Sequence, residues 1–193
     1  VSHYVDWAKE GVTYNDKILQ FQTWSVDGWG ILYNKDIFEE AGITEAPTDF
    51  ASFKDACDKV LAIGKTPIYE AGAAQWHLGV WLSGLTTQTE ADNPGFYDGL
   101  NDNTQTLAGQ EGLATALDEM VELNDAGYFG DDFMANTWED APSKMASGDY
   151  AMCVTYTTFP AEVEAINPDM PADTFGMFPI PLNDNTTFGV SAG

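Results

Sequence analysis

Carboxylates are the side chains of this sequence with the clearest capacity for catalysis. Two adjacent pairs, Asp131–Asp132 and Glu139–Asp140, are of the type with which glycoside hydrolases act, one acid protonating the leaving oxygen while the other attacks or activates water. The 193-residue chain contains 31 Asp and Glu residues, so adjacent pairs are expected by chance. A catalytic carboxylate is also distinguished by its environment rather than by its presence. A carbohydrate-active enzyme is therefore kept as an alternative and not as the main hypothesis.

Other sequence patterns give little support to catalysis or metal binding. The two histidines, His3 and His77, stand alone, so neither a His-based triad nor a metal cluster has two natural members. The sequence has no phosphate-binding glycine loop and no G-x-S-x-G nucleophile motif. Acidic and amide residues gather over residues 92–103, but their spacing does not fit a calcium-binding loop and favours a solvated turn. The sequence therefore predicts no metal and no cofactor.

Cys57 and Cys153 are the two cysteines of the chain. Neither lies in a C-x-x-C or His-flanked spacing, so zinc binding and thioredoxin-like chemistry have no support. Cys57 occupies the apolar stripe of an expected helix, and Cys153 lies in an apolar run, which is typical of small buried hydrophobic residues. A disulfide between them is left open.

The charge of the chain restricts its partners. Seven lysines and no arginine face the 31 acids, which gives a formal net charge of −24 at pH 7. Affinity for nucleic acids comes mainly from Lys and Arg that displace counterions, and anionic membrane surfaces attract basic segments. We therefore expect no binding to nucleic acid or to acidic ligands, and we interpret most of the acidity as an aid to solubility.

Tryptophan is the informative residue type. Six tryptophans is a high number for this length, and indole rings in clefts pack against amphipathic ligands such as sugars, whose C–H faces lie on the ring. Core packing is the alternative, and it accounts for Trp81 and Trp7. Trp29, Trp76 and Trp138 instead lie at the ends of expected elements, where binding sites are commonly built. We expect these three rings to contribute to a ligand site.

The elements that must position these rings alternate along the chain. Runs of β-branched and aromatic residues predict strands over residues 28–34, 67–69, 149–156, 175–179 and 188–191. Helical spacing of apolar residues, with caps and terminal glycines, predicts helices over residues 35–42, 50–63, 75–85, 109–127, 138–147 and 160–166. Residues 86–108 are expected to form an irregular surface excursion. The interleaving predicts an α/β fold with helices packed around a short mixed sheet.

One segment connects the sequence to a known family. Residues 33–43 read YNKDIFEEAGI and resemble a segment of the family-1 extracellular solute-binding proteins of sugar ABC transporters, the relatives of maltose-binding protein. Further similar motifs follow in the order of that family, at residues 15–17, 47–53, 145–152, 175–181 and 189–193. The motifs depart from the family pattern at Asp49, Phe50, Met145 and Asp149. Each motif is weak alone, but their common order across nearly the whole chain is specific.

The resemblance implies an architecture and a division of the chain. Family members are bilobal, with a type II periplasmic-binding-protein-like fold, and this chain would supply the hinge strand and the C-terminal lobe. Residues 1–26 would be the approach to the hinge, a remnant of the N-terminal lobe, and residues 27–193 would be the C-terminal lobe. Both ends of the chain look cut, and no signal peptide is visible.

The resemblance also implies ligand-binding positions. Asp27 falls where the relatives place a carboxylate that accepts sugar hydroxyls, and Trp76 falls in the loop that supplies stacking aromatics. Trp138 falls near a position that is aromatic in the maltose-specific member. A stacking Trp of the relatives is replaced by Thr158, which leaves open which neighbouring ring stacks. The alternatives are a helix-capping role for Asp27 and core packing of the rings. The residues expected to bind ligand are Asp27, Trp29, Gln75, Trp76, His77, Trp138, Tyr156, Thr157, Thr158 and Phe159.

The function implied by the resemblance is a non-enzymatic one. The protein would be the carbohydrate-binding component of an ABC-type sugar importer, with two lobes that close on a mono- or oligosaccharide by hinge bending. Its partners would be a neutral carbohydrate and the permease subunits, and it would lie at the extracellular face of the membrane, as a lipoprotein or in the periplasm. Since the chain has no arginine, a neutral or cationic sugar is expected. A glycoside hydrolase and a structural module without a ligand are the alternatives.

Overall fold

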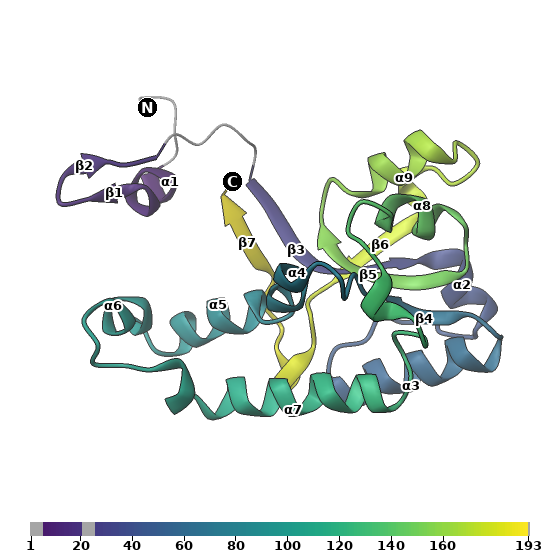
Figure 1. Ribbon diagram of the computed structural model, residues 1–193, viewed down its shortest axis with the longest axis horizontal. Helices are drawn as coiled ribbons and strands as arrows, with labels where there is room; N and C mark the ends of the chain where they lie inside the picture. Colours follow the sequence, from purple (N-terminus) through teal and green to yellow (C-terminus); the bar gives the residue numbers. More distant parts are fainter. Residues whose placement is uncertain (1–5, 21–25, 193) are drawn as a thin grey trace.

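A computed structural model describes residues 6–20 and 26–192 of the chain (Figure 1). Residues 6–20 form helix α1 (Asp6–Gly11) and a short antiparallel hairpin of β1 (Thr13–Tyr14) and β2 (Lys17–Ile18). The two turn residues, Asn15 and Asp16, both have positive φ. A two-residue hairpin turn of this hand needs positive φ at both positions, which Asn and Asp tolerate better than most residues.

The remainder is built on a five-stranded mixed sheet centred on the longest strand, β3. Its strands are β3 (Val26–Asn34), β4 (Thr66–Tyr69), β5 (Tyr150–Tyr156), β6 (Phe175–Phe178) and β7 (Gly189–Ala192). One edge of β3 pairs antiparallel with β5, and β4 joins the far edge of β5 in parallel. The other edge of β3 is shared, because its first half pairs with β7 and its second half with β6. The predicted α/β fold with a mixed sheet is confirmed.

Both faces of the sheet are covered by helices. Neighbouring strand residues point to opposite faces, so Ile31 and Met152 enter one core cluster while Leu32 and Cys153 enter the other. Figure 1 shows α3 (Phe50–Ala62) and α7 (Glu111–Asp125) beneath the sheet and α8 (Ala141–Ala146) and α9 (Pro160–Ile166) above it. A strand buried on both faces reads as a continuous apolar run rather than an alternating one, which explains the sequence of β5.

The first two helices after β3 begin and end where their caps predict. The Asn34 side chain accepts hydrogen bonds from the backbone N–H groups of residues 36 and 37 at the start of α2 (Lys35–Glu40). Asp49 and Ser52 form a reciprocal capping box at the start of α3 (Phe50–Ala62). Gly42 and Gly64 follow these helices with φ of 72° and 78°. A left-handed residue is inexpensive only for glycine, so both helices end there.

Six further α-helices and four short 3-10 helices follow α3 among the described residues. The α-helices are α4 (Gln75–Val80), α5 (Ser83–Asp92), α6 (Phe96–Asn101), α7 (Glu111–Asp125), α8 (Ala141–Ala146) and α9 (Pro160–Ile166). The short 3-10 helices are η1 (Leu107–Gly109), η2 (Phe133–Ala135), η3 (Ala172–Thr174) and η4 (Leu182–Asp184). Within the two described ranges, no helix combines the length and the apolar character needed to cross a bilayer.

Two expected elements differ in the structure. The helix expected over residues 75–85 is divided into α4 and the start of α5, with Trp81 fully buried at the break. The irregular excursion expected over residues 86–108 is wrong, since most of α5 and all of α6 lie there. The Glu90 carboxylate of α5 accepts hydrogen bonds from the backbone N–H groups of Gly95 and Tyr97. These two bonds connect α5 to the start of α6. These local bonds, together with the buried Phe96, supply the order that the polar sequence does not indicate.

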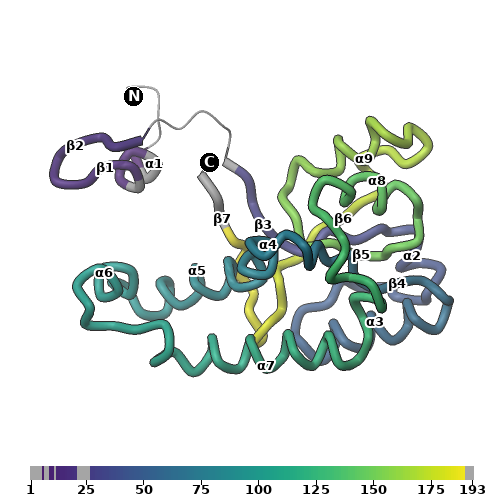
Figure 2. Tube along the Cα trace, viewed as in Figure 1, coloured from purple at the N-terminus to yellow at the C-terminus, as the bar shows by residue number. Residues whose placement is uncertain are grey.

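The first residues of β3 lie beside the last residues of β7. Val26 pairs with Ala192 and Gly28 with Val190, where β3 begins and β7 ends. Figure 2 shows the coloured parts of β3 and β7 lying side by side next to this end. Trp29 is the last residue of β3 to pair with β7 and the first to pair with β5. The backbone of Trp29 is therefore held between β5 and β7.

Candidate functional site

Four aromatic side chains from distant parts of the chain gather at one end of the sheet. They come from β3, α4, the turn before α8 and the end of β5, and we call them the aromatic cluster: Trp29, Trp76, Trp138 and Tyr156. Trp138 is central, with ring centroids 5.3 Å from Trp76, 6.1 Å from Tyr156 and 6.5 Å from Trp29. Trp29 and Tyr156 meet edge to face at 5.2 Å. These distances are typical of favourable aromatic pairs.

The aromatic cluster is open to solvent. Trp76 is 53% exposed, and Trp29, Trp138 and Tyr156 are half-buried. Burying a large ring completely is the more stable arrangement in the absence of another role, so an exposed group of rings of this size is typical of an interaction site. Core packing is correct for Trp81, which is fully buried, and it applies in part to Trp138 and Tyr156, whose inner sides pack against a core cluster.

Two residues predicted to bind ligand lie beneath the cluster instead. His77 and Phe159 have no exposed surface. Their rings pack under Trp138, with centroids 4.8 Å and 5.7 Å away. The expectation that they contact ligand directly is therefore corrected, because neither side chain faces solvent. Gln75, their neighbour in α4, is exposed beside Trp76.

The backbone explains why these rings meet. Trp29 and Tyr156 are directly opposite in the antiparallel pair of β3 and β5. The turn that carries Trp138 is tied to β4, because the Tyr69 hydroxyl donates to the carbonyl of Thr137 at 2.6 Å. The Asn136 side-chain amide also donates to the carbonyl of Glu70 at 3.2 Å. The aromatic cluster is thus fixed by sheet register and by loop-to-sheet hydrogen bonds.

A polar group adjoins the rings at the start of β3. The hydroxyls of Thr157 and Thr158 both donate to Oδ1 of Asp27, at 3.1 Å and 3.3 Å, and the backbone N–H of Thr157 donates to the carbonyl of Gly28 at 3.0 Å. Asp27 lies within a strand, so the helix-capping alternative is wrong. Both hydroxyls use the same oxygen, and no side chain that the structure describes donates to the second oxygen of this carboxylate.

Tyr156 joins the aromatic and polar parts of the site. Its hydroxyl donates to the Glu162 carboxylate of α9. Burial raises the pKa of the Tyr156 phenol well above its ordinary value, and the negative charges of Glu162 and Asp27 act in the same direction. The phenol therefore stays neutral and keeps its hydrogen at physiological pH.

A cavity lies on the other side of the two threonines. It has a volume of about 390 Å³ and reaches from α9 to β6, with walls formed by Leu32, Thr157, Thr158, Pro160, Ala161, Ala172, Phe175, Gly176 and Met177. Thr157 and Thr158 are thus placed between this cavity and Asp27. Their hydroxyls are the polar groups at that boundary.

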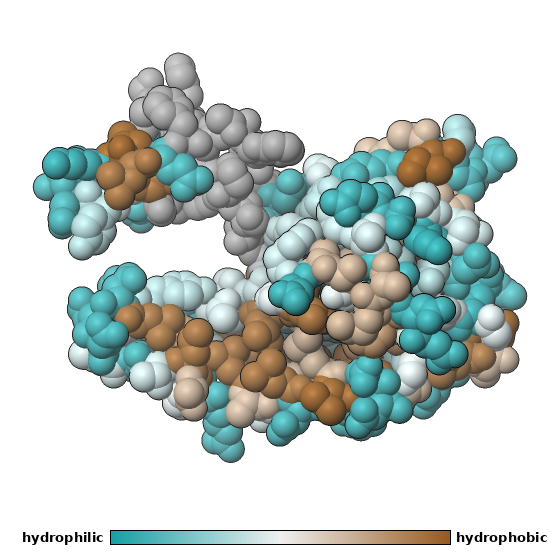
Figure 3. All heavy atoms as spheres, viewed as in Figure 1, coloured by the Kyte–Doolittle hydropathy of each residue, from teal (hydrophilic) through white to brown (hydrophobic). Residues whose placement is uncertain are grey.

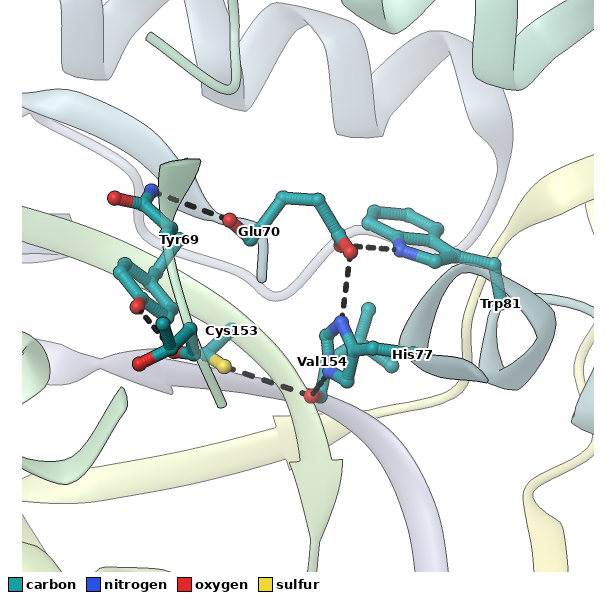
Figure 4. Close-up of polar contacts among 8 residues, drawn as sticks. Tyr69, Glu70, His77, Trp81, Cys153 and Val154 are labelled. Atoms are coloured by element: carbon teal, nitrogen blue, oxygen red, sulfur yellow. Dashed lines mark hydrogen bonds and ion pairs between the residues drawn. The ribbon is translucent and has the colours of Figure 1, made fainter. Parts of the chain in front are cut away.

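A buried polar network supports α4 below the rings (Figure 4). The Glu70 carboxylate accepts the indole N–H of Trp81 at 2.7 Å and lies 2.8 Å from Nδ1 of His77. Nε2 of His77 lies 2.9 Å from the carbonyl oxygen of Val154 in β5. Glu70 and His77 are both fully buried. Glu70 is not among the residues predicted to bind ligand, and its one signal in the sequence is its place as an acidic residue directly after a short apolar strand.

The carboxylate pairs have no comparable setting. Asp131, Asp132, Glu139 and Asp140 are all exposed, and Asp140 accepts a hydrogen bond from the Thr137 hydroxyl at 2.8 Å. Among the described residues, no group of three or more His, Cys, Asp or Glu side chains is placed to hold a metal ion. Cys57 and Cys153 are free thiols, both buried, which answers the question of a disulfide.

Figure 3 shows a separate apolar surface over α5 and α7. It contains a groove of about 460 Å³ that shares no residue with the predicted site; its walls are Leu82, Thr86, Leu107, Ala108, Gln110, Leu113, Ala114 and Leu117. Two polar side chains in this lining are too few for the many hydroxyls of a sugar. The groove is therefore not a second candidate for the carbohydrate site.

Comparison with known proteins identifies the class. Residues 3–193 match the bacterial extracellular solute-binding protein family, so the chain belongs to that family. Its members are non-enzymatic receptors, which removes the glycoside hydrolase alternative. A search of curated protein sequences finds no match.

Solved structures show the same fold. A binding protein of an ABC transporter from Bifidobacterium animalis subsp. lactis, in complex with mannobiose, has a TM-score of 0.78 at 20% identity, over 98% of this chain and 45% of that one. A chitin oligosaccharide binding protein has a TM-score of 0.74 at 21% identity, over 94% and 47% of the two chains. The GacH receptor of Streptomyces glaucescens, solved with acarbose, has a TM-score of 0.67 at 19% identity, over 99% and 48%. The chain spans less than half the length of these proteins and matches half of a bilobal fold.

Proposed function

We propose that this chain is the hinge and C-terminal lobe of a carbohydrate receptor that serves an ABC-type importer. The observation that supports this most directly is the aromatic cluster, which is exposed and lies beside the Asp27 carboxylate and its two threonines. Residues 1–26 would then be the approach to the hinge, and residues 27–193 the lobe. The antiparallel pairing of β3 and β7, which places Val26 beside Ala192, agrees with two strands that connect to a second lobe.

The chemistry of the site matches a sugar. The C–H faces of a pyranose pack against indole and phenol rings, while its hydroxyls need acceptors and donors at the edges of those rings. Asp27 supplies an acceptor, Thr157 and Thr158 supply hydroxyls, and Gln75 supplies an amide beside Trp76. A ligand that stacks on Trp76 or Trp138 would therefore have polar partners at the Asp27 side and at the α4 side.

The charge of the chain selects among sugars. Lysines are few and arginine is absent, with a net charge of −24, so a phosphorylated or sulfated sugar would be repelled. A neutral or cationic mono- or oligosaccharide is the ligand class we infer. The related structures named above were solved with, or are named for, oligosaccharides. Permease subunits as partners, and an extracellular location, follow from the same proposal.

The test is a ligand screen of the 193-residue chain. Saturation-transfer NMR, which detects weak binding, would be run with mannobiose, a chitin oligosaccharide and acarbose, and with glucose 6-phosphate as the anionic control. We expect a signal from at least one neutral oligosaccharide that is lost in Trp76→Ala and a weaker or absent signal from the phosphate. Preferred binding of the phosphate would overturn the ligand class. Lack of any carbohydrate signal from a folded chain would overturn the proposal for this lobe.

A further inference from the structure

Glu70 occupies an unusual position for a carboxylate. It follows β4 directly, has no exposed surface, and contacts two residues of the next segment, His77 and Trp81. Burying a charged group is costly unless hydrogen bonds replace the lost water. Here both carboxylate oxygens are used, one by the Trp81 indole N–H and the other by the His77 ring. Figure 4 shows the carboxylate between these two side chains.

The geometry determines where the protons of this network lie. Nε2 of His77 faces the carbonyl oxygen of Val154, and a carbonyl can only accept, so Nε2 carries a hydrogen. The contact between Nδ1 and Glu70 is a single hydrogen bond, which needs one further proton, on the ring or on the carboxyl group. In either state the network joins β4, α4 and β5 through three hydrogen bonds.

The network lies directly under the aromatic cluster. The His77 ring is 4.8 Å from Trp138, with planes inclined by 33°, and 5.5 Å from Trp76, with planes inclined by 88°. The backbone carbonyl of Glu70 also accepts the Asn136 amide, two residues before Trp138. Glu70 therefore contacts the supports of both rings: α4 through its side chain and the Trp138 turn through its backbone.

We propose that Glu70 is a positioning residue for the aromatic cluster, which holds the Trp76 and Trp138 rings in a fixed arrangement through His77 and Trp81. Its consequence for ligand affinity rests on the proposed function, whereas the arrangement of the rings does not. A rigid pair of rings loses less entropy when a ligand stacks on it, so removing the network lowers affinity without removing any ligand contact.

Two substitutions of Glu70 separate hydrogen bonding from volume. In Glu70→Gln the amide oxygen accepts the Trp81 indole and the amide NH₂ donates to Nδ1 of a neutral His77, which keeps its hydrogen on Nε2. All three hydrogen bonds survive. Glu70→Met has nearly the same volume but leaves the His77 and Trp81 groups without their partner. Trp81→Phe removes only one of the three hydrogen bonds and keeps an aromatic side chain, while the smaller ring leaves a cavity in the core.

The experiment reads ring positions without ligand. The 193-residue chain is labelled with 5-fluorotryptophan, and the Trp76 and Trp138 resonances are assigned by ¹⁹F NMR of Trp76→Phe and Trp138→Phe. We expect both resonances to move and broaden in Glu70→Met, to move less in Trp81→Phe, and to stay in place in Glu70→Gln. Leu123→Ala is the control for general loss of stability, because it leaves a cavity at a fully buried position of α7. This variant should leave the Trp76 and Trp138 resonances in place.

The outcomes decide the proposal. Unchanged Trp76 and Trp138 resonances in Glu70→Met would overturn the positioning role. If that variant does not fold, unchanged resonances in Trp81→Phe would overturn it instead. Shifts of the same size in the Leu123→Ala control would also overturn it. The same variants are then titrated with mannobiose and a chitin oligosaccharide, where Glu70→Met should weaken binding about tenfold and Glu70→Gln should not. If the wild-type chain binds neither sugar, the proposed function fails while the resonance shifts still test the positioning role.

Discussion

Trp29 and Tyr156 face each other across the antiparallel pair of β3 and β5, and their rings meet edge to face with centroids 5.2 Å apart. Trp29 is also the residue at which β3 changes partner from β7 to β6. The ring pair is therefore attached to the middle of the sheet, where β3 has paired strands on both of its edges. Trp76 and Trp138, by contrast, are carried by a six-residue helix and a turn, which makes them the half of the aromatic cluster that depends on support from Glu70 and His77.

Trp76 is the ring most accessible to a ligand, so its removal is the most direct test of the site. Trp76→Ala should weaken binding of a neutral oligosaccharide by about tenfold or more, because one stacking face is lost. The free energy of unfolding should fall by less than about 1 kcal/mol, since the side chain is largely in solvent. Binding is measured by NMR titration and stability by urea denaturation.

Tyr97→Ala is the matched control for Trp76. Tyr97 is 43% exposed on α6 and belongs to none of the contacts of the aromatic cluster. Its substitution should leave carbohydrate binding unchanged. Equal losses in the two variants would show that aromatic exposure in general, and not the aromatic cluster, determines binding.

The carboxylate of Asp27 should contribute through its charge. In Asp27→Asn one oxygen still accepts from Thr157 and Thr158, so the strand should stay intact, but a sugar hydroxyl loses an ionised acceptor. Charge-assisted hydrogen bonds are about twice as strong as neutral ones, so affinity should fall about three- to tenfold. The measurement is calorimetry or NMR titration, with Thr157→Val as a companion that removes one of the two donors. Unchanged affinity in both variants would remove this polar group from the site.

The sequence predicts most of the fold because local and tertiary signals agree there. The caps Asn34 and Asp49 and the terminal glycines Gly42 and Gly64 act within one turn of the helix they limit, so they can be recognised from spacing alone. The helix α5 is different. Half of its ten residues are Thr, Gln or Glu, and it has no apolar stripe. Its threonine hydroxyls donate to backbone carbonyls such as those of Ser83 and Leu85. Such a helix is held by its tertiary neighbours, which spacing does not show.

The candidate site is predictable in part for a similar reason. Residue type and position at the ends of elements select the exposed rings, and sheet register brings two of them together. Burial is a property of the assembled fold, so the sequence could not separate the exposed Trp76 from its buried neighbour His77. It also could not identify Glu70, whose partners lie seven and eleven residues away, one in α4 and the other at the break directly after it. The sequence pattern predicts a continuous helix across this break.

Gly30 is a position where the sheet leaves no room for a side chain. A Cβ at this residue would lie 2.6 Å from the carbonyl oxygen of Phe178 and 2.8 Å from the Phe188 ring. Gly30→Ala should therefore lower the free energy of unfolding by about 1–3 kcal/mol, the usual cost of overpacking. Gly79→Ala in α4 is the control, since a Cβ there meets nothing within 4 Å and alanine favours a helix. The free energy of unfolding, measured by urea denaturation, should be clearly lower for Gly30→Ala than for wild type and equal or higher for Gly79→Ala. The opposite order would contradict the packing of β3 against β6.

The two cysteines should be unreactive in the folded protein. Burial raises the pKa of both the Cys57 and Cys153 thiols, and the thiolate is the form that attacks a disulfide reagent. Ellman's reagent at pH 8 should therefore label almost no thiol in the native chain and both thiols in guanidinium chloride. Rapid labelling of the native chain would show that one of the two cores opens. Absence of labelling after unfolding would show that the cysteines are oxidised.

Asp49 gives the fold a stability contribution that depends on pH in a defined direction. Its carboxylate accepts the Ser52 backbone N–H, and the Ser52 hydroxyl accepts the Asp49 backbone N–H in return. Hydrogen bonding with the side chain and the backbone of Ser52 lowers the pKa of Asp49 below the ordinary value of 3.8. A lowered pKa in the folded state means that the charged form favours folding, so the contribution is complete above about pH 4 and is lost as the pH falls through the folded-state pKa.

Asp49→Ser keeps a side-chain cap that does not titrate. The difference in free energy of unfolding between wild type and Asp49→Ser, measured by urea denaturation from pH 7 to pH 3, should therefore shift against the wild type as the pH falls below about 4. A difference that is constant across this range, or one that shifts toward the wild type in acid, would show that the Asp49 carboxylate is not held as the cap of α3.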